Sequence, residues 1–102
     1  MGLFGSISGK EVDAFAKSLA RELAERLPPA QAPRSSQTRR LDAALDDICR
    51  KALAFKQQNR LGVYKTARLG NTFRWELAAL GYEERFTEDA TQYLVVRIAP
   101  RR

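Results

Sequence analysis

The spacing of apolar residues predicts a long amphipathic helix near the start of the chain. Apolar residues recur there at intervals of three and four, which places them on one helix face: Val12, Phe15, Ala16, Leu19, Leu23 and Leu27. Ser8 and Glu11 have the spacing of a capping box, so we expect the helix to begin there, and Pro28 and Pro29 to end it. Opposite charges four residues apart predict ion pairs within this helix: Asp13–Lys17, Arg21–Glu25 and Glu22–Arg26.

The same kind of pattern predicts a second helix from Ser36 or Thr38 to about Arg60. Its apolar positions are spaced four, three, four and three, as in a heptad seam or a bundle helix: Leu41, Leu45, Ile48, Ala52 and Phe55. Residues 28–36 contain three prolines and predict a semi-extended connector between the two helices. Gly62 is expected to close the second helix in the left-handed conformation.

Residues 63–82 predict two shorter helices separated by a turn. A helix from Val63 to Leu69 is expected to break at Gly70-Asn71, and another is expected from Thr72 to Leu80, before a cap at Gly81. The apolar residues of this stretch fall on one face: Leu69, Phe73, Leu77 and Leu80. The stretch therefore has the outline of a helix-turn-helix.

The last element has two interpretations, a helix or a β-hairpin. As a helix it has Thr87 as N-cap and apolar residues at every fourth position: Phe86, Ala90, Leu94 and Ile98. As a hairpin it has strands at 82–87 and 91–98, supported by β-branched residues. We favour the helix because the would-be turn has no Gly, Asn or Pro. The predicted fold is an all-α bundle of four or five helices, and the alternative is an α+β fold of winged-helix type with a C-terminal hairpin.

Length and composition predict one domain over residues 1–102, in which residues 1–7 are expected to form a flexible arm. The length is 102 residues, of which 44% are hydrophobic and 29% charged, as in ordinary globular proteins. A single cysteine excludes an intrachain disulfide and, with no apolar run near the length of a membrane span, predicts a cytoplasmic protein. Gly2 and Ser6 match a loose myristoylation pattern, but the arginine- and alanine-rich usage is typical of bacteria, where this modification is not expected.

The net charge of +6 raises the question of a polyanionic partner. Residues 37–60 carry six basic and three acidic side chains, and residues 61–81 carry three and one, so the excess lies in the middle of the chain. Net charge alone speaks to solubility and non-specific association. It therefore permits nucleic-acid binding without establishing it.

The residues offer little for catalysis. Histidine is absent, which excludes a Ser-His-Asp triad, a Cys-His dyad and a histidine metal site. Cys49 falls on the apolar side of the second helix and is expected to be buried and inert. Asp42 and Asp46 share a face with Arg39 and Arg50, which is typical of a surface charge ladder. We expect no enzyme activity, metal or cofactor.

Two binding hypotheses remain, and both use the middle of the chain. The first is a protein-interaction module that binds another protein or a second copy of itself as a homodimer. In this hypothesis Trp75 lies away from the apolar stripe and anchors the partner. The alternative without a partner is that Trp75 packs under the N-terminal arm or the first helix. The second hypothesis is nucleic-acid binding by the helix-turn-helix, although a second helix with Ala78, Ala79 and one basic residue suits base reading poorly. The candidate surface comprises Arg60, Tyr64, Lys65, Arg68, Arg74 and Trp75.

Overall fold

The protein is an all-α bundle of four helices, as the apolar spacing predicted. The computed structural model describes residues 7–31 and 39–99. Its α-helices are α1 (Gly9–Arg26), α2 (Arg39–Asn59), α3 (Val63–Ala79) and α4 (Glu84–Ile98), and a 3₁₀ turn, η1 (Pro29–Gln31), follows α1. These ranges contain no β-strand, so the alternative of a winged-helix fold with a C-terminal hairpin is wrong.

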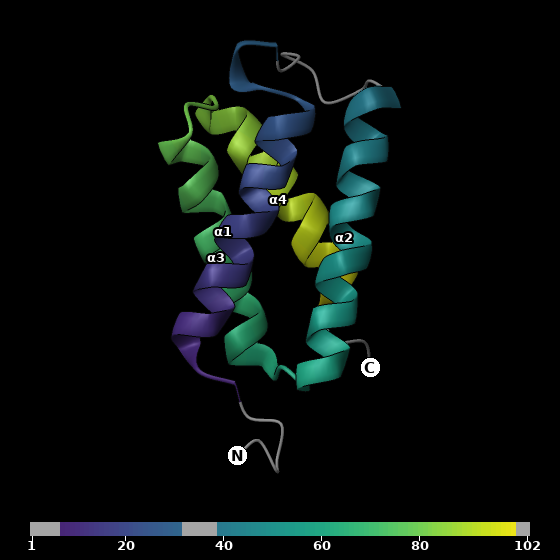
Figure 1. Ribbon diagram of the computed structural model, residues 1–102, viewed down its shortest axis with the longest axis vertical. Coiled ribbons are helices and arrows are strands. Elements are labelled where there is room, and N and C mark those ends of the chain that lie inside the picture. Colours follow the sequence, from purple (N-terminus) through teal and green to yellow (C-terminus); the bar gives the residue numbers. More distant parts are fainter. Residues whose placement is uncertain (1–6, 32–38, 100–102) are drawn as a thin grey trace.

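The four helices form a closed ring in the order α1, α3, α4, α2 (Figure 1). The chain runs up α1, down α2, up α3 and down α4, so α1 and α3 are parallel neighbours although α2 separates them in sequence (Figure 1). Residues that pair between α1 and α3, or just beyond their ends, differ by 55 in residue number. Asp13 pairs with Arg68, Arg21 with Glu76, and Leu27 with Tyr82.

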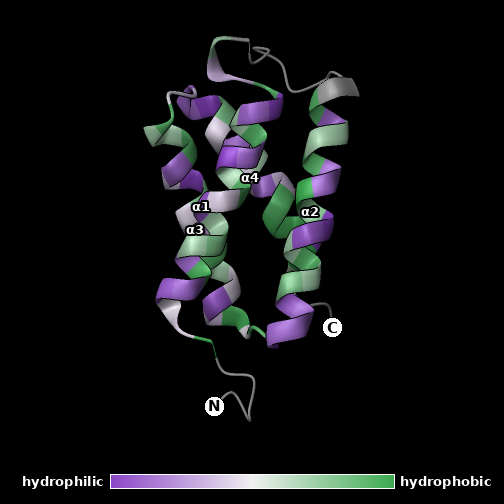
Figure 2. Ribbon diagram, in the orientation of Figure 1, coloured by the Kyte–Doolittle hydropathy of each residue, from purple (hydrophilic) through white to green (hydrophobic). Residues whose placement is uncertain are grey.

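One hydrophobic core fills the ring, and every helix contributes to it. Hydrophilic and hydrophobic patches alternate along all four ribbons, as expected for amphipathic helices (Figure 2). Most of the predicted stripe positions are buried, while Phe15 and Phe55 are partly buried and stack with their ring centroids 3.8 Å apart. The largest fully buried side chains are Phe73, Leu19, Leu23, Leu41, Ile48, Leu69, Leu77, Leu94 and Ile98.

The helix ends confirm two predicted caps and correct a third. Ser8 and Glu11 form the capping box of α1, and Gly81, with a φ of 107°, closes α3. At the end of α2, however, the left-handed residue is Arg60, with a φ of 52°, and not Gly62, which is extended and precedes α3. The Leu61 N–H donates to the Lys56 carbonyl, as in a Schellman motif, so the cap lies two residues earlier than predicted.

The predicted break at Gly70-Asn71 is wrong, because α3 is continuous through it. Gly70 is buried where α3 crosses α4, and a β-carbon there would lie 2.6 Å from Val95 Cγ2. The glycine therefore permits a close helix crossing instead of a turn. The helix-turn-helix that depended on the break is absent from residues 63–79.

The C-terminal helix forms as favoured, but it begins earlier than predicted. Its N-cap is Glu83, and Thr87 is a buried interior residue whose hydroxyl donates to the Glu84 carbonyl. The four residues at every fourth position are all buried: Phe86, Ala90, Leu94 and Ile98.

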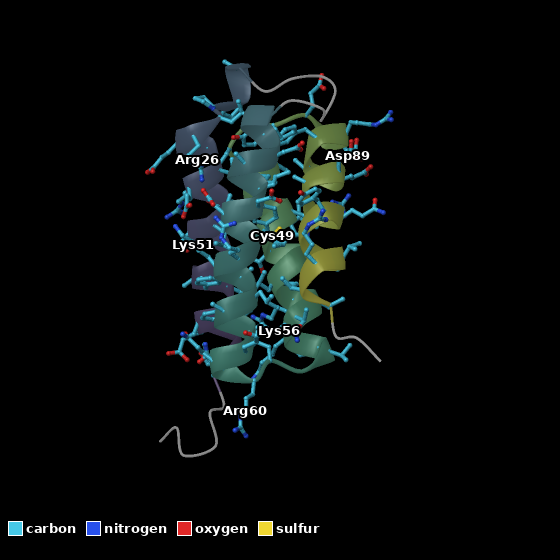
Figure 3. All side chains as sticks on the ribbon, turned by 90° about the vertical axis from the view of Figure 1, so that its right-hand side faces the viewer. Arg26, Cys49, Lys51, Lys56, Arg60 and Asp89 are labelled. Atoms are coloured by element: carbon cyan, nitrogen blue, oxygen red, sulfur yellow. The ribbon has the colours of Figure 1, made fainter. Side chains whose placement is uncertain are left out.

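The ion pairs of α1 also differ from the predicted intrahelical set. Arg21 binds Glu76 of α3 at 3.2 Å, whereas Glu22 and Arg26 bind Lys51 and Asp47 of α2 at 2.7 and 2.6 Å. Arg26 and Lys51 lie along the side where α1 meets α2 (Figure 3). The charged residues of α1 thus join helices, because neighbouring helices offer partners that an isolated helix lacks.

Some predictions concern segments outside the described residues. Most of the predicted flexible arm falls on residues 1–6, which are not described. Part of the connector, and the predicted helix start at Ser36 or Thr38, fall on residues 32–38, which are not described either. The connector residues that are described include the short 3₁₀ turn η1. Across the described ranges, none of the helices combines the length and apolar character needed to cross a membrane.

Candidate protein-interaction surface

The outer face of α3 presents a row of exposed residues that we call the α3 stripe: Tyr64, Ala67, Asn71, Trp75 and Ala78. Their spacing of three and four keeps them on one line of a continuous helix. Tyr64 is 71% exposed and Trp75 is 61% exposed, which is a high exposed fraction for large aromatic side chains. From Tyr64 to Ala78 the stripe extends about 21 Å at 1.5 Å per residue. It carries no charged side chain of its own.

Arg68 borders the stripe, but its charge is already paired. Its guanidinium donates to both carboxylate oxygens of Asp13, at 3.0 and 2.8 Å, and Thr72 donates to the same carboxylate at 2.8 Å. The hydrogen bond from Arg68 is the main reason that the pKa of Asp13 falls to about 2, with the Thr72 hydroxyl next. The same bond raises the pKa of Arg68 above its usual value. The pair therefore fixes the start of α1 to α3 and leaves little net charge beside Tyr64.

Arg74 borders the other half of the stripe and is also engaged. Its guanidinium lies 3.6 Å from the Glu88 carboxylate and 5.6 Å from the centroid of the Trp75 ring. This distance is within the range of a cation–π contact. Arg74 thus holds the indole from one side while the rest of the ring stays exposed.

The six predicted site residues do not form one cluster. Tyr64 and Trp75 share the stripe, and Arg68 and Arg74 flank it, whereas Lys65 donates to the Ile7 carbonyl at the start of α1. Arg60 is at the end of α2 and points away from the bundle (Figure 3). Tyr64 and Trp75 are about 16 Å apart along the helix. A stacking cluster of Tyr64, Arg68 and Trp75, of the kind that binds single-stranded nucleic acid, is therefore not assembled.

Sequence reasoning missed three members of the stripe, Ala67, Asn71 and Ala78. The expected break placed Ala67 and Ala78 in different helices and Asn71 in the turn between them, so their common face was not recognised. The signal was present as the spacing three, four, four and three between Tyr64 and Ala78, which is a helical period when read without the break. The alternative in which Trp75 packs under the first helix is wrong, since its side chain on α3 is largely exposed. Packing under the N-terminal arm concerns residues 1–6, which lie outside the described residues.

Cys49 and Tyr93 are held in states of low reactivity. Cys49 is buried, as predicted, and burial raises the pKa of its thiol to about 11, which disfavours the reactive thiolate. Asp46 accepts a hydrogen bond from the Tyr93 hydroxyl at 2.6 Å, and this bond, with burial, raises the pKa of Tyr93 to about 12. Within residues 7–31 and 39–99, no three acidic or cysteine side chains gather as a metal site would require.

The comparisons with known proteins leave the α3 stripe as the main guide to function. No protein-family model matches the chain, and neither the curated proteins nor the solved structures gave a significant match.

Proposed function

We propose that the protein is a non-enzymatic interaction module that associates with a second copy of itself through the α3 stripe. The observation that carries this proposal is the order of residue sizes along the stripe. About Asn71, the positions are symmetric: Ala67 and Trp75 lie four residues to either side, and Tyr64 and Ala78 lie seven. Each large side chain is thus matched by a small one at the same distance on the other side.

This symmetry makes the stripe complementary to itself in an antiparallel pair. A two-fold axis beside Asn71 brings Trp75 of one copy against Ala67 of the other, and Tyr64 against Ala78. Large side chains then fill the spaces over alanines, as in the core layers of antiparallel helix pairs. The two Asn71 amides meet at the axis, where each amide offers both a donor and an acceptor to the other.

The charges next to the stripe are compatible with such a pair. At 100° per residue, Arg68 and Arg74 lie about 60° to either side of Asn71, compared with about 40° for Ala67 and Trp75. The two arginines therefore lie at the edges of such a pair and do not meet across it. Asp13 and Glu88 accompany them. Exposed aromatic residues are frequent anchors of protein interfaces. The absence of histidine from the chain and the buried thiol support a binding role over a catalytic one.

A swap of side-chain sizes tests this arrangement. Sedimentation equilibrium of the full chain is expected to show a dimer that Trp75→Ala weakens by at least about tenfold, a typical effect of removing an interface anchor. Ala67→Trp alone places two indoles in one layer and is expected to weaken the dimer as well. The double variant Trp75→Ala with Ala67→Trp restores one large and one small residue per layer, so dimerisation should recover.

Val96 supplies the matched control. It is exposed to the same extent as Trp75, 61%, but lies on α4, so Val96→Ala should leave the dimer unchanged. A chain that stays monomeric at millimolar concentration contradicts the proposal, and so does a double variant no better than the single ones. The second result would show that large-to-small matching along α3 does not hold two copies together.

A further inference from the structure

A cavity lies between α2 and α4, on another side of the ring from the α3 stripe. Its volume is about 130 Å³, and its walls come from the first turns of α2 and the first three turns of α4. The walls are mainly apolar: Leu41, Leu45, Phe86, Ala90 and the ring of Tyr93. Apolar cavities of roughly 150 Å³ accept a benzene ring, so this cavity is large enough for a small apolar group.

Two carboxylates line the same cavity from opposite helices. Asp42 belongs to α2 and Asp89 to α4, where Asp89 lies near the end of the bundle at which both helices begin (Figure 3). Asp42 is exposed and makes no ion pair with a side chain that the structure describes. Asp89 has Arg85 at 3.9 Å, a long contact in which the arginine is 82% exposed. Both carboxylates are exposed at the cavity, where a ligand can reach them.

The aromatic wall is suited to positive charge. Tyr93 already holds the Arg97 guanidinium 3.5 Å from its ring centroid, and its hydroxyl is directed to Asp46. Negative carboxylates and electron-rich rings both attract cations. The charged residues that line the cavity, Asp42 and Asp89, are both acidic, in contrast to the net charge of +6 on the chain as a whole.

We propose that this cavity binds a small organic ammonium ion, with its apolar body between Leu45, Phe86 and Ala90 and its charged group at Asp42 and Asp89. The apolar body gains by leaving water, and the ammonium group keeps its charge at the open mouth. The recognition is independent of self-association, because none of the cavity residues belongs to the α3 stripe.

An NMR titration of the full, isotope-labelled chain with benzylammonium tests the proposal. We expect saturable shifts at Leu41, Leu45, Phe86 and Ala90, with a dissociation constant on the order of millimolar. Benzyl alcohol has the same ring without the charge and should bind at least about fivefold more weakly, since an exposed ion pair contributes modestly to binding. The Asp42→Asn, Asp89→Asn double variant should lose the same factor for benzylammonium.

Two further variants test whether binding of benzylammonium requires this cavity or only the net charge of the protein. Glu25→Gln with Glu83→Gln changes the net charge equally, but neither residue lines the cavity, so binding should persist. Ala90→Val fills the cavity and should abolish the shifts, while its own spectrum shows whether the bundle stays folded. Equal affinity for benzylammonium and benzyl alcohol overturns the proposal, as does unchanged binding in the Asn variant or the absence of saturable shifts in the wild-type chain.

Discussion

At the scale of single residues, Arg60 is the clearest departure from local backbone preference. Its φ of 52° lies in the left-handed region, which costs a residue with a β-carbon about 1 kcal/mol or more. Arg60→Gly removes this cost, although glycine also loses more freedom on folding, so we expect a net gain of about 0.5–1 kcal/mol in the free energy of unfolding. Urea denaturation measures the gain.

Two substitutions control for charge and for glycine itself. Arg60→Ala also removes the guanidinium but keeps the β-carbon, so it should not reproduce the gain. Gln58→Gly, in the last exposed turn of α2, should instead lower stability by up to about 1 kcal/mol, because glycine is unfavourable in a helix. If Arg60→Gly and Arg60→Ala behave alike, the strained conformation is not a source of instability.

The caps show how far local sequence determines a helix end. Ser8 with Glu11 and Gly81 were predicted correctly because their side chains, or the lack of one, satisfy the backbone locally. The cap at Arg60 was not predictable from residue type, since Leu61 must reach the core and is only 6% exposed. Burial of Leu61 therefore favours an arginine in a conformation that the nearby Gly62 would adopt more easily.

At the scale of elements, Gly70 links the continuity of α3 to its contact with α4. Gly70→Ala would ordinarily stabilise a helix by about 1 kcal/mol, but its β-carbon would lie 2.6 Å from Val95 Cγ2. Valine has few alternative rotamers in a helix, so we expect Gly70→Ala to lower the free energy of unfolding by about 1–3 kcal/mol. Denaturant unfolding monitored by circular dichroism provides the measurement.

A double-mutant cycle isolates the contact between the two helices. Val95→Ala removes the clashing methyl group, so Gly70→Ala should cost much less in that background, with a coupling energy of at least about 1 kcal/mol. Equal effects of Gly70→Ala in both backgrounds would show that the close approach to Val95 does not explain the glycine.

Gly70 also explains why the helices could be predicted only in part from the sequence. Apolar spacing located α1, α2 and α4, because amphipathic periodicity survives in any bundle that buries one face. Gly70-Asn71 has the local character of a turn, yet packing against α4 keeps the helix intact, and no local signal records that contact. The error hid most of the α3 stripe, because its residues share a face only on an unbroken helix.

At the scale of the whole molecule, the ring order depends on contacts that sequence patterns do not reveal. The constant offset of 55 residues between α1 and α3 is maintained by Asp13 with Arg68, Arg21 with Glu76, and the Tyr82 hydroxyl with the Leu27 carbonyl. Asp13 and Arg21 each have an opposite charge four residues away, at Lys17 and Glu25, which local reasoning favours as the partner. Tertiary neighbours take precedence, so the all-α class could be anticipated from the sequence but the pairing of the helices could not.

The net charge of +6 gives self-association and nucleic-acid binding opposite responses to salt. Two basic copies repel each other over long distances, and raising salt from about 10 to 150 mM shortens the screening length from about 30 to 8 Å. Since the α3 stripe itself is uncharged, screening removes repulsion without weakening its contacts. We therefore expect sedimentation equilibrium to show a dimer that becomes several-fold tighter over this range.

Binding to duplex DNA would show the reverse, because cations that replace counterions on phosphates lose affinity steeply as salt rises. A gel-shift assay at both salt concentrations, with Lys65→Ala and Trp75→Ala variants, distinguishes the two responses. Retention of DNA that falls with salt and depends on Lys65 would support the nucleic-acid hypothesis at the expense of self-association. A dimer that weakens with salt would also contradict the proposed interface, since charged contacts and not the matching of Trp75 with Ala67 would then hold the copies together.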